Sequence, residues 1–300
     1  MKTLVFAVIR CSLLFLLPTL TYATSAQWDL DAISGDWNTP VNWTPMGIPN
    51  GPADIAIFGL SNTTDASIST NTEVNGAIFT PAATNPYTIT ASPGLTLTIS
   101  GVGIVNISGT TQNFVTAGGE IRFRNHATAG DNVTLSNDGG TMSFFNHSST
   151  GGATFVSNNG GITNFFDHST ASGFIDVDNE SFVSFYNSSS AGTVQIQTEF
   201  AGGAVSFFDH STGGSAGLFI TEQTSLSFGA TRLRATHSWV PSGLFIFPTL
   251  PQRATRPFSA TVPFFSATLP RAAQHKLRLG RSQTSMISAP STLAVTTRRA

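Results

Sequence analysis

Hydrophobic and polar residues alternate with a period of two along much of the chain, and no stretch has a convincing helical period. Between about residues 64 and 116, apolar and hydroxyl residues alternate, as in Leu95-Thr96-Leu97-Thr98-Ile99. Pro-Gly and Ser-Gly pairs separate these stretches. The pattern predicts short strands with one buried face, and therefore an all-β protein.

A motif that approximates Phe-aromatic-Asn/Asp-His-Ser follows and recurs at intervals of 21, 21, 20, 22 and 21 residues. Its first residue is always phenylalanine: Phe123, Phe144, Phe165, Phe185, Phe207 and Phe228. A constant short period indicates stacked coils, whereas the blades of a propeller need about 40 residues or more. We therefore predict a parallel β-helix, or solenoid, with coils of about 21 residues.

The position two residues before this phenylalanine is apolar in five of the six copies. Residues i and i−2 of a strand share one face, so we expect the six phenylalanines to form a ladder in the core. The next position accepts Arg124 and Gly229 in the first and last copies, which excludes a deep core site. The remaining copies hold Phe145, Phe166, Tyr186 and Phe208, an expected outward stripe that could contact a glycan or a protein.

Asparagine or aspartate follows, at Asn125, Asn146, Asp167, Asn187 and Asp209. These residue types tolerate left-handed backbone and predict a turn in every coil. The position after the turn residue carries His126, His147, His168 and His210, with Ser188 in one copy. One hypothesis is a metal-binding ladder, and the other is a solvent-facing corner. We favour the corner, because no carboxylate accompanies every histidine, and we predict no metal or cofactor.

A β-helix can also carry polysaccharide lyases or hydrolases, which use carboxylates on one outer face. The candidate carboxylates are Asp167, Asp176, Asp178, Glu180, Asp209 and Glu222. Asp167 and Asp209 only repeat the turn position, and the chain contains no glycine-nucleophile motif, phosphate loop or calcium-binding nonapeptide. We therefore predict a non-enzymatic protein, with a polysaccharide-binding or polysaccharide-degrading β-helix as the alternative.

Residues 1–23 have the pattern of a signal peptide: Lys2, an apolar stretch from Leu4 to Leu20, and small residues before a cleavage site after Ala23, with Ala26 as the alternative. The single cysteine, Cys11, lies inside this segment, so no disulfide is expected in the mature chain. We also expect no transmembrane segment in the mature chain. The predicted location is secreted or on the cell surface.

Residues 24–60 contain Trp28, Trp37 and Trp43 among turn-forming residues. These tryptophans could form a carbohydrate-binding platform, but a solenoid also needs its first coil covered. We therefore interpret residues 24–60 as an N-terminal cap and residues 61–231 as the repeat domain.

Composition changes at residue 232. Residues 232–300 contain ten basic residues, no Asp, Glu or Asn, and seven of the 15 prolines. Such a tail could bind nucleic acid or an anionic surface. The interpretation that we favour is a disordered or non-native continuation, as after a reading-frame shift. We predict no nucleic-acid binding for the repeat domain.

The Trp-spaced Gly35-Asp36-Trp37-Asn38 stretch and the Gly-Gly-x-apolar-x-Phe coils resemble the passenger regions of bacterial autotransporter-type surface proteins over roughly residues 27–230. The resemblance implies a right-handed parallel β-helix displayed outside the cell as an adhesin or scaffold, with glycans or neighbouring surface proteins as partners. Residues 232–300 lack the alternating ~10-residue strands of a translocator barrel. The resemblance therefore covers only the β-helix portion, and the chain is expected to be a truncated passenger.

Overall fold

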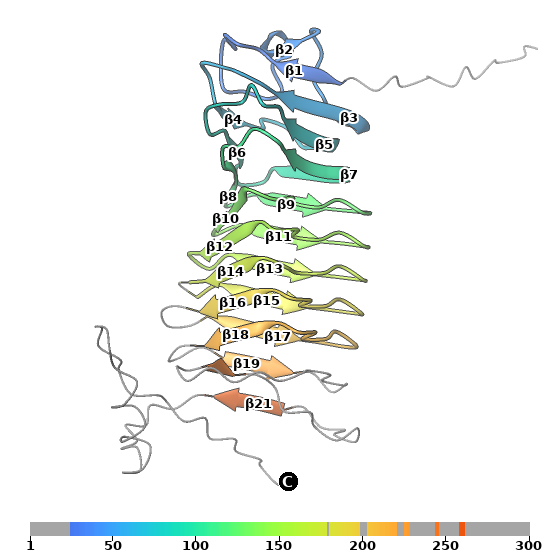
Figure 1. The fold of residues 1–300 in the computed structure, drawn as a ribbon, viewed down its shortest axis with the longest axis vertical. Helices are drawn as coiled ribbons and strands as arrows, with labels where there is room; N and C mark the ends of the chain where they lie inside the picture. The colour runs from blue at the N-terminus through green and yellow to red at the C-terminus, as the bar shows by residue number, and fades with distance from the viewer. Residues whose placement is uncertain are drawn as a thin grey trace, which may run out of the picture.

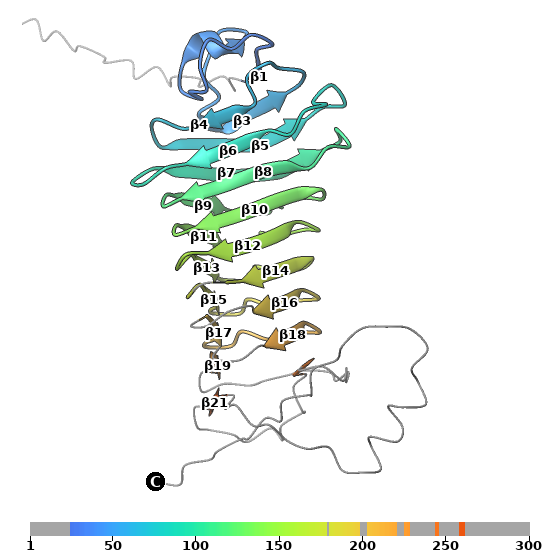
Figure 2. The same ribbon diagram turned by 90° about the vertical axis from the view of Figure 1, so that its left-hand side faces the viewer.

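The computed structural model describes residues 25–178, 180–198, 203–220, 225–228, 244–245 and 258–261. They form a parallel β-solenoid of about 8 turns with a spacing of about 21 residues (Figures 1 and 2), which confirms the predicted fold class. The predicted signal peptide lies outside the described residues. Of residues 232–300, the structure describes only two short strands, β20 (Leu244–Phe245) and β21 (Phe258–Thr261), which pair antiparallel with β18 (Gly217–Ile220) and β19 (Ser225–Phe228).

Each coil contributes one strand to each of two sheets. The 12-stranded sheet consists, in spatial order, of β2 (Trp43–Thr44), β1 (Ala26–Trp28), β3 (Gly51–Phe58), β5 (Thr72–Phe79), β7 (Thr96–Asn106), β9 (Glu120–Phe123), β11 (Thr141–Phe144), β13 (Ile162–Phe165), β15 (Phe182–Phe185), β17 (Ala204–Phe207), β19 (Ser225–Phe228) and β21 (Phe258–Thr261). The 9-stranded sheet consists of β20 (Leu244–Phe245), β18 (Gly217–Ile220), β16 (Gln195–Thr198), β14 (Phe174–Val177), β12 (Thr154–Asn158), β10 (Val133–Asp138), β8 (Gln112–Ala117), β6 (Thr88–Ala91) and β4 (Asp65–Ser67). From β3 to β19 every pairing in the first sheet is parallel.

Single-residue parallel bridges join the coils along a third side, through Thr128, Ser149, Thr170, Ser190 and Thr212. A coil therefore runs through three hydrogen-bonded ladders. The third ladder is short because glycines with positive φ follow it, as at Gly192 (φ 53°). A Cβ on Gly192 would lie 2.3 Å from the carbonyl oxygen of Ala171 in the preceding coil, so this corner requires glycine.

The repeated phenylalanines are in register, since Phe123, Phe144, Phe165, Phe185, Phe207 and Phe228 pair with one another from strand to strand. Their side chains from Phe123 to Phe207 are buried and stacked, with ring centroids 4.6–4.8 Å apart. The second sheet faces them with buried residues such as Phe114, Leu135, Phe155 and Ile175. Alternation at period two thus places one continuous apolar core between the sheets.

The N-terminal segment covers the first coil. Trp28, Trp37 and Trp43 are at most 1% exposed and pack edge-on with centroids 5.0 Å apart, so they offer no exposed platform for a sugar. The only described helix, the 3-10 helix η1 (Pro40–Asn42), leads into β2. Backbone bonds from Trp37 N–H to the Ser67 carbonyl, and from Ser67 N–H to the Gly35 carbonyl, close the free edge of β4.

Polar side chains hold the edges of this cap and of the first coils. Asp36 accepts hydrogen bonds from the Asn38 N–H (3.1 Å) and the Thr39 hydroxyl (2.7 Å). Burial alone would raise the pKa of Asp36, but hydrogen bonds with Thr39, Ser69 and Asn38 lower it below its ordinary value. Burial raises the pKa of Tyr87 to about 12, and its hydroxyl donates to the Gly59 carbonyl at 2.7 Å.

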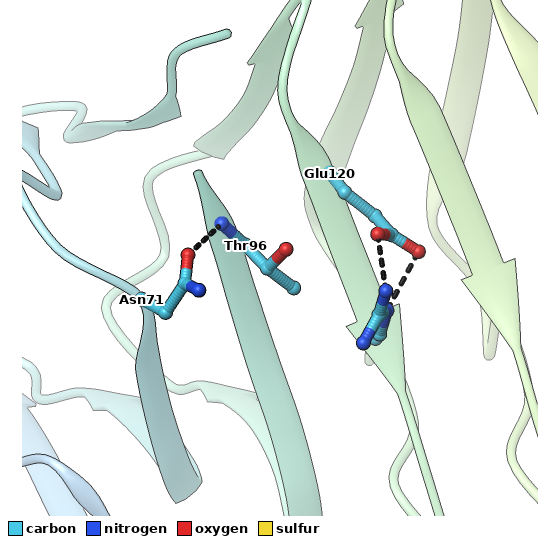
Figure 3. Close-up of polar contacts among 4 residues, drawn as sticks. Asn71, Thr96 and Glu120 are labelled. Carbon is cyan, nitrogen blue, oxygen red and sulfur yellow. Dashed lines mark hydrogen bonds and ion pairs between the residues drawn. The ribbon is translucent and has the colours of Figure 1, made fainter. Parts of the chain in front are cut away.

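Between strands of the first sheet, Asn71 Oδ1 accepts the Thr96 N–H at 2.9 Å (Figure 3). On β9, Arg122 donates two hydrogen bonds of 2.6 Å to Glu120, which raise the pKa of the guanidinium (Figure 3). This pair lies on the outer face of the sheet, and Arg122 keeps 40% of its side chain exposed. It is a solvated ion pair and contributes little to stability.

Candidate binding face

One corner of the solenoid gathers the repeat positions that follow the core phenylalanine. The predicted turn residues all have positive φ of 55–59°, at Asn125, Asn146, Asp167, Asn187 and Asp209. Left-handed backbone is least costly for asparagine and aspartate among residues with side chains. This turn redirects the chain from the first sheet toward the third ladder. The residues before and after the turn therefore point outward and form neighbouring strips of surface.

The turn residues are also bonded to one another. The N–H of Asn125 donates to Asn146 Oδ1 at 3.0 Å, and the N–H of Asn146 donates to Asp167 Oδ2 at 2.8 Å. The series continues from Asp167 N–H to Asn187 Oδ1 and from Asn187 N–H to Asp209 Oδ2. From Asn146 to Asp209, each side chain thus accepts the N–H of the turn residue in the preceding coil, which ties neighbouring corners together. Asp167 and Asp209 take part in this series in the same way as the asparagines.

The aromatic ladder, defined as Phe145, Phe166, Tyr186 and Phe208, lies immediately before these turns. Its rings are stacked with centroids 4.8–5.0 Å apart and planes within 13° of parallel. Arg124 lies over the Phe145 ring at 5.6 Å. Phe145, Phe166 and Tyr186 are half-buried and Phe208 is 36% exposed. Because the rings cover one another's faces, the ladder presents mainly ring edges to solvent.

The imidazole row, defined as His126, His147, His168 and His210 with Ser188 between the last two, lies just after the turns. All five side chains are exposed. The rings of His126, His147 and His168 are stacked with centroids 5.3 and 5.2 Å apart. Within the described residues, no group of three or more His, Cys, Asp or Glu side chains has the arrangement of a metal site.

The hydroxyl row, defined as Thr128, Ser149, Thr170, Ser190 and Thr212, is the outward side of the third ladder. Sequence reasoning missed this row. It stands five residues after each core phenylalanine, and that constant offset could have revealed it. Thr170 is exposed and the other four are half-exposed. Together the imidazole and hydroxyl rows form the third face of the solenoid, two residues wide.

Among the described residues, the remaining carboxylate candidates do not extend this face. Asp176 lies on β14 and Asp178 just after it, in the second sheet, and both have interaction partners. Glu180 is exposed in a turn with φ 63°, and Glu222 lies outside the described residues. The five candidates that the structure describes are therefore divided between separate parts of the coil.

The described chain is thus a β-solenoid repeat protein. No family model, curated protein or solved structure matches it. No helix in the described part of the chain has the length and apolar content needed to cross a membrane.

Proposed function

We propose that the chain is a non-enzymatic exported surface protein, an autotransporter-type passenger in which the solenoid is a rigid scaffold that displays an adhesive face. The observation that carries this proposal is the aromatic ladder. Four aromatic side chains occupy one outward position in four consecutive coils and remain partly exposed. A solenoid core needs no aromatic residue outside, and contiguous apolar surface on a soluble domain is typical of an interaction site.

The rest of the solenoid supports a scaffold role. Its coils stack in register without interruption from β9 to β19, so the surface rows are held at fixed positions along one axis. Low charge (10% charged residues) and an N-terminal signal-like segment favour a passive exported protein. The described carboxylate candidates lie in turns or in separate parts of the coil, which favours a binding function over a hydrolase or lyase.

The proposal is tested by adhesion of beads coated with the mature chain to cultured epithelial cells and to bacterial cells. The ladder variant combines Phe145→Ser, Phe166→Ser, Tyr186→Ser and Phe208→Ser. The control variant combines Ile162→Ser and Phe182→Ser, which remove exposed apolar side chains (42% and 43%) from the outer face of the first sheet. Circular dichroism and thermal unfolding show which variants remain folded.

We expect wild-type and control beads to adhere to at least one cell type, and ladder-variant beads to adhere at least fivefold less. Adhesion of wild-type beads no stronger than that of albumin-coated beads contradicts the adhesive role. Equal adhesion of a folded ladder variant and the wild type shows that the ladder is not the contact. The export part is checked separately by intact-mass measurement of the mature N-terminus in the medium or on the cell surface.

A further inference from the structure

We propose that the third face is a binding track for a neutral, linear polysaccharide that lies along the solenoid axis. This inference rests on the proposed function, because it requires display outside the cell. It assigns the ligand to a different strip of surface from the aromatic ladder. The track is the pair of rows defined above, His126 to His210 and Thr128 to Thr212.

The spacing of the rows favours a periodic ligand. Coils stack at about 4.8 Å, and the two rows, two residues apart on a short strand, are separated by about 6.6 Å. One sugar unit of an extended polysaccharide is about as long as one coil step. A chain along the axis would therefore meet an equivalent pair of side chains at each successive sugar, and weak contacts would add through multivalency.

The chemistry of the rows favours a ligand rich in hydroxyl groups. Imidazoles and hydroxyls both donate and accept hydrogen bonds, as sugar hydroxyls do. The exposed imidazoles of His126, His147 and His168 stack on one another, which leaves their ring nitrogens at the edge of the stack. In the hydroxyl row, Thr128 and Ser190 accept backbone N–H groups and Thr212 donates to Ser190, whereas among the described residues Ser149 and Thr170 have no hydroxyl partner. Hydrogen-bonding capacity is thus left open in three consecutive coils.

The charge of the face favours a neutral ligand. Neither row contains Lys, Arg, Asp or Glu. The neighbouring carboxylates, Asp131 beside the hydroxyl row and Asp167 and Asp209 in the turns, would repel a polyanion. Nucleic acids and acidic polysaccharides need a cluster of cations for affinity, which this face lacks.

The aromatic ladder is the less suitable site for a sugar. A sugar packs its C–H face against the face of an aromatic ring, and the ladder rings cover one another at 4.8–5.0 Å. Their exposed edges suit apolar contact with a protein surface. The two strips therefore predict two separable activities.

The experiment is a pull-down of the mature chain with insoluble cellulose, β-1,3-glucan and mannan, followed by affinity measurement with a soluble oligomer of the polysaccharide that retains it. Soluble alginate serves as the acidic comparison. The track variant combines His147→Ala, His168→Ala and Thr170→Val, and the ladder variant serves as the matched control. A gain-of-function variant, Ser188→His, completes the imidazole row across all five coils.

We expect one neutral polysaccharide to bind, with Kd raised at least tenfold in the track variant and changed less than twofold in the ladder variant. Ser188→His should lower Kd at least twofold. Absence of binding to all three neutral polysaccharides overturns the track, as does preference for alginate or equal loss of binding in the folded ladder variant. Cell adhesion that depends on the ladder would survive such a result, so failure of the track and failure of the proposed function are distinguishable.

Discussion

Two adjacent phenylalanines provide a direct test of which side of each coil faces the core. Phe165 is fully buried, with ring centroids 4.8 Å from Phe144 and 4.6 Å from Phe185. Its replacement by alanine should cost about 3–5 kcal/mol, because a buried ring is removed and a cavity remains. Phe166 is half-buried in the aromatic ladder. Its replacement by alanine should cost about 1–2 kcal/mol, because a half-exposed ring loses only part of its burial energy.

The assay is guanidinium chloride denaturation followed by far-UV circular dichroism. Both variants remove the same atoms from neighbouring positions, so effects on the unfolded chain largely cancel. A difference of about 2–3 kcal/mol with a slope near 5 kcal/mol/M predicts midpoints about 0.5 M apart. Solenoids can unfold in several steps, so the main transition is compared. Equal midpoints, or a lower midpoint for Phe166→Ala, would show that the inward and outward assignments are wrong.

Three further predictions concern a carboxylate, a corner and a phenol. Asp36→Asn should lower the melting temperature at pH 7 and have a progressively smaller effect at acid pH, because the stabilisation from a lowered pKa is complete above the ordinary pKa of aspartate and is lost as pH falls through the lowered pKa. A difference that stays the same at acid pH would contradict this. Gly192→Ala should lower the denaturation midpoint more than Gly94→Ala; both have positive φ, but a Cβ at Gly94 meets nothing within 4 Å. Equal shifts would exclude the carbonyl clash. Tyr87 has a pKa raised to about 12, so its neutral phenol stabilises the fold below its ordinary pKa and loses this effect as pH rises. Melting curves should therefore show the wild type losing more stability than Tyr87→Phe between pH ~9 and ~12. Equal losses in the two proteins would refute the role of the neutral phenol.

The fold could be predicted from the sequence because each coil repeats the same pattern of buried, exposed and turn-forming residues. The constant spacing of Phe123 to Phe228, the apolar residue two positions earlier and the Asn/Asp turn position together predicted stacking, burial and left-handed backbone. The structure has all three features in the copies whose side chains it describes. A repeat sequence predicts its fold when the spacing, the apolar pattern and the turn residues all indicate the same structure.

The third ladder could not be predicted from alternation of apolar and polar residues. Its outward residues are Ser and Thr and its inward residues are small, so no alternation of apolar and polar residues marks a strand. Ser148, Ser169 and Ser189 are fully buried although serine usually indicates a surface position. Only the stacking of coils shows that they line the inside of a narrow corner where larger side chains would not fit.

The candidate binding face was partly predictable, because its residues recur at fixed positions in each coil. The sequence indicated which side chains point outward, because position within a coil decides that. It did not indicate how outward rings lie relative to one another, since this depends on the ~4.8 Å separation of coils. At that separation, aromatic side chains in register cover each other's faces, whereas imidazoles and hydroxyls keep their hydrogen-bonding atoms at the surface. The same stacking covers the ring faces of the aromatic ladder and leaves the hydrogen-bonding atoms of the third face at the surface, which favours the third face as the glycan site.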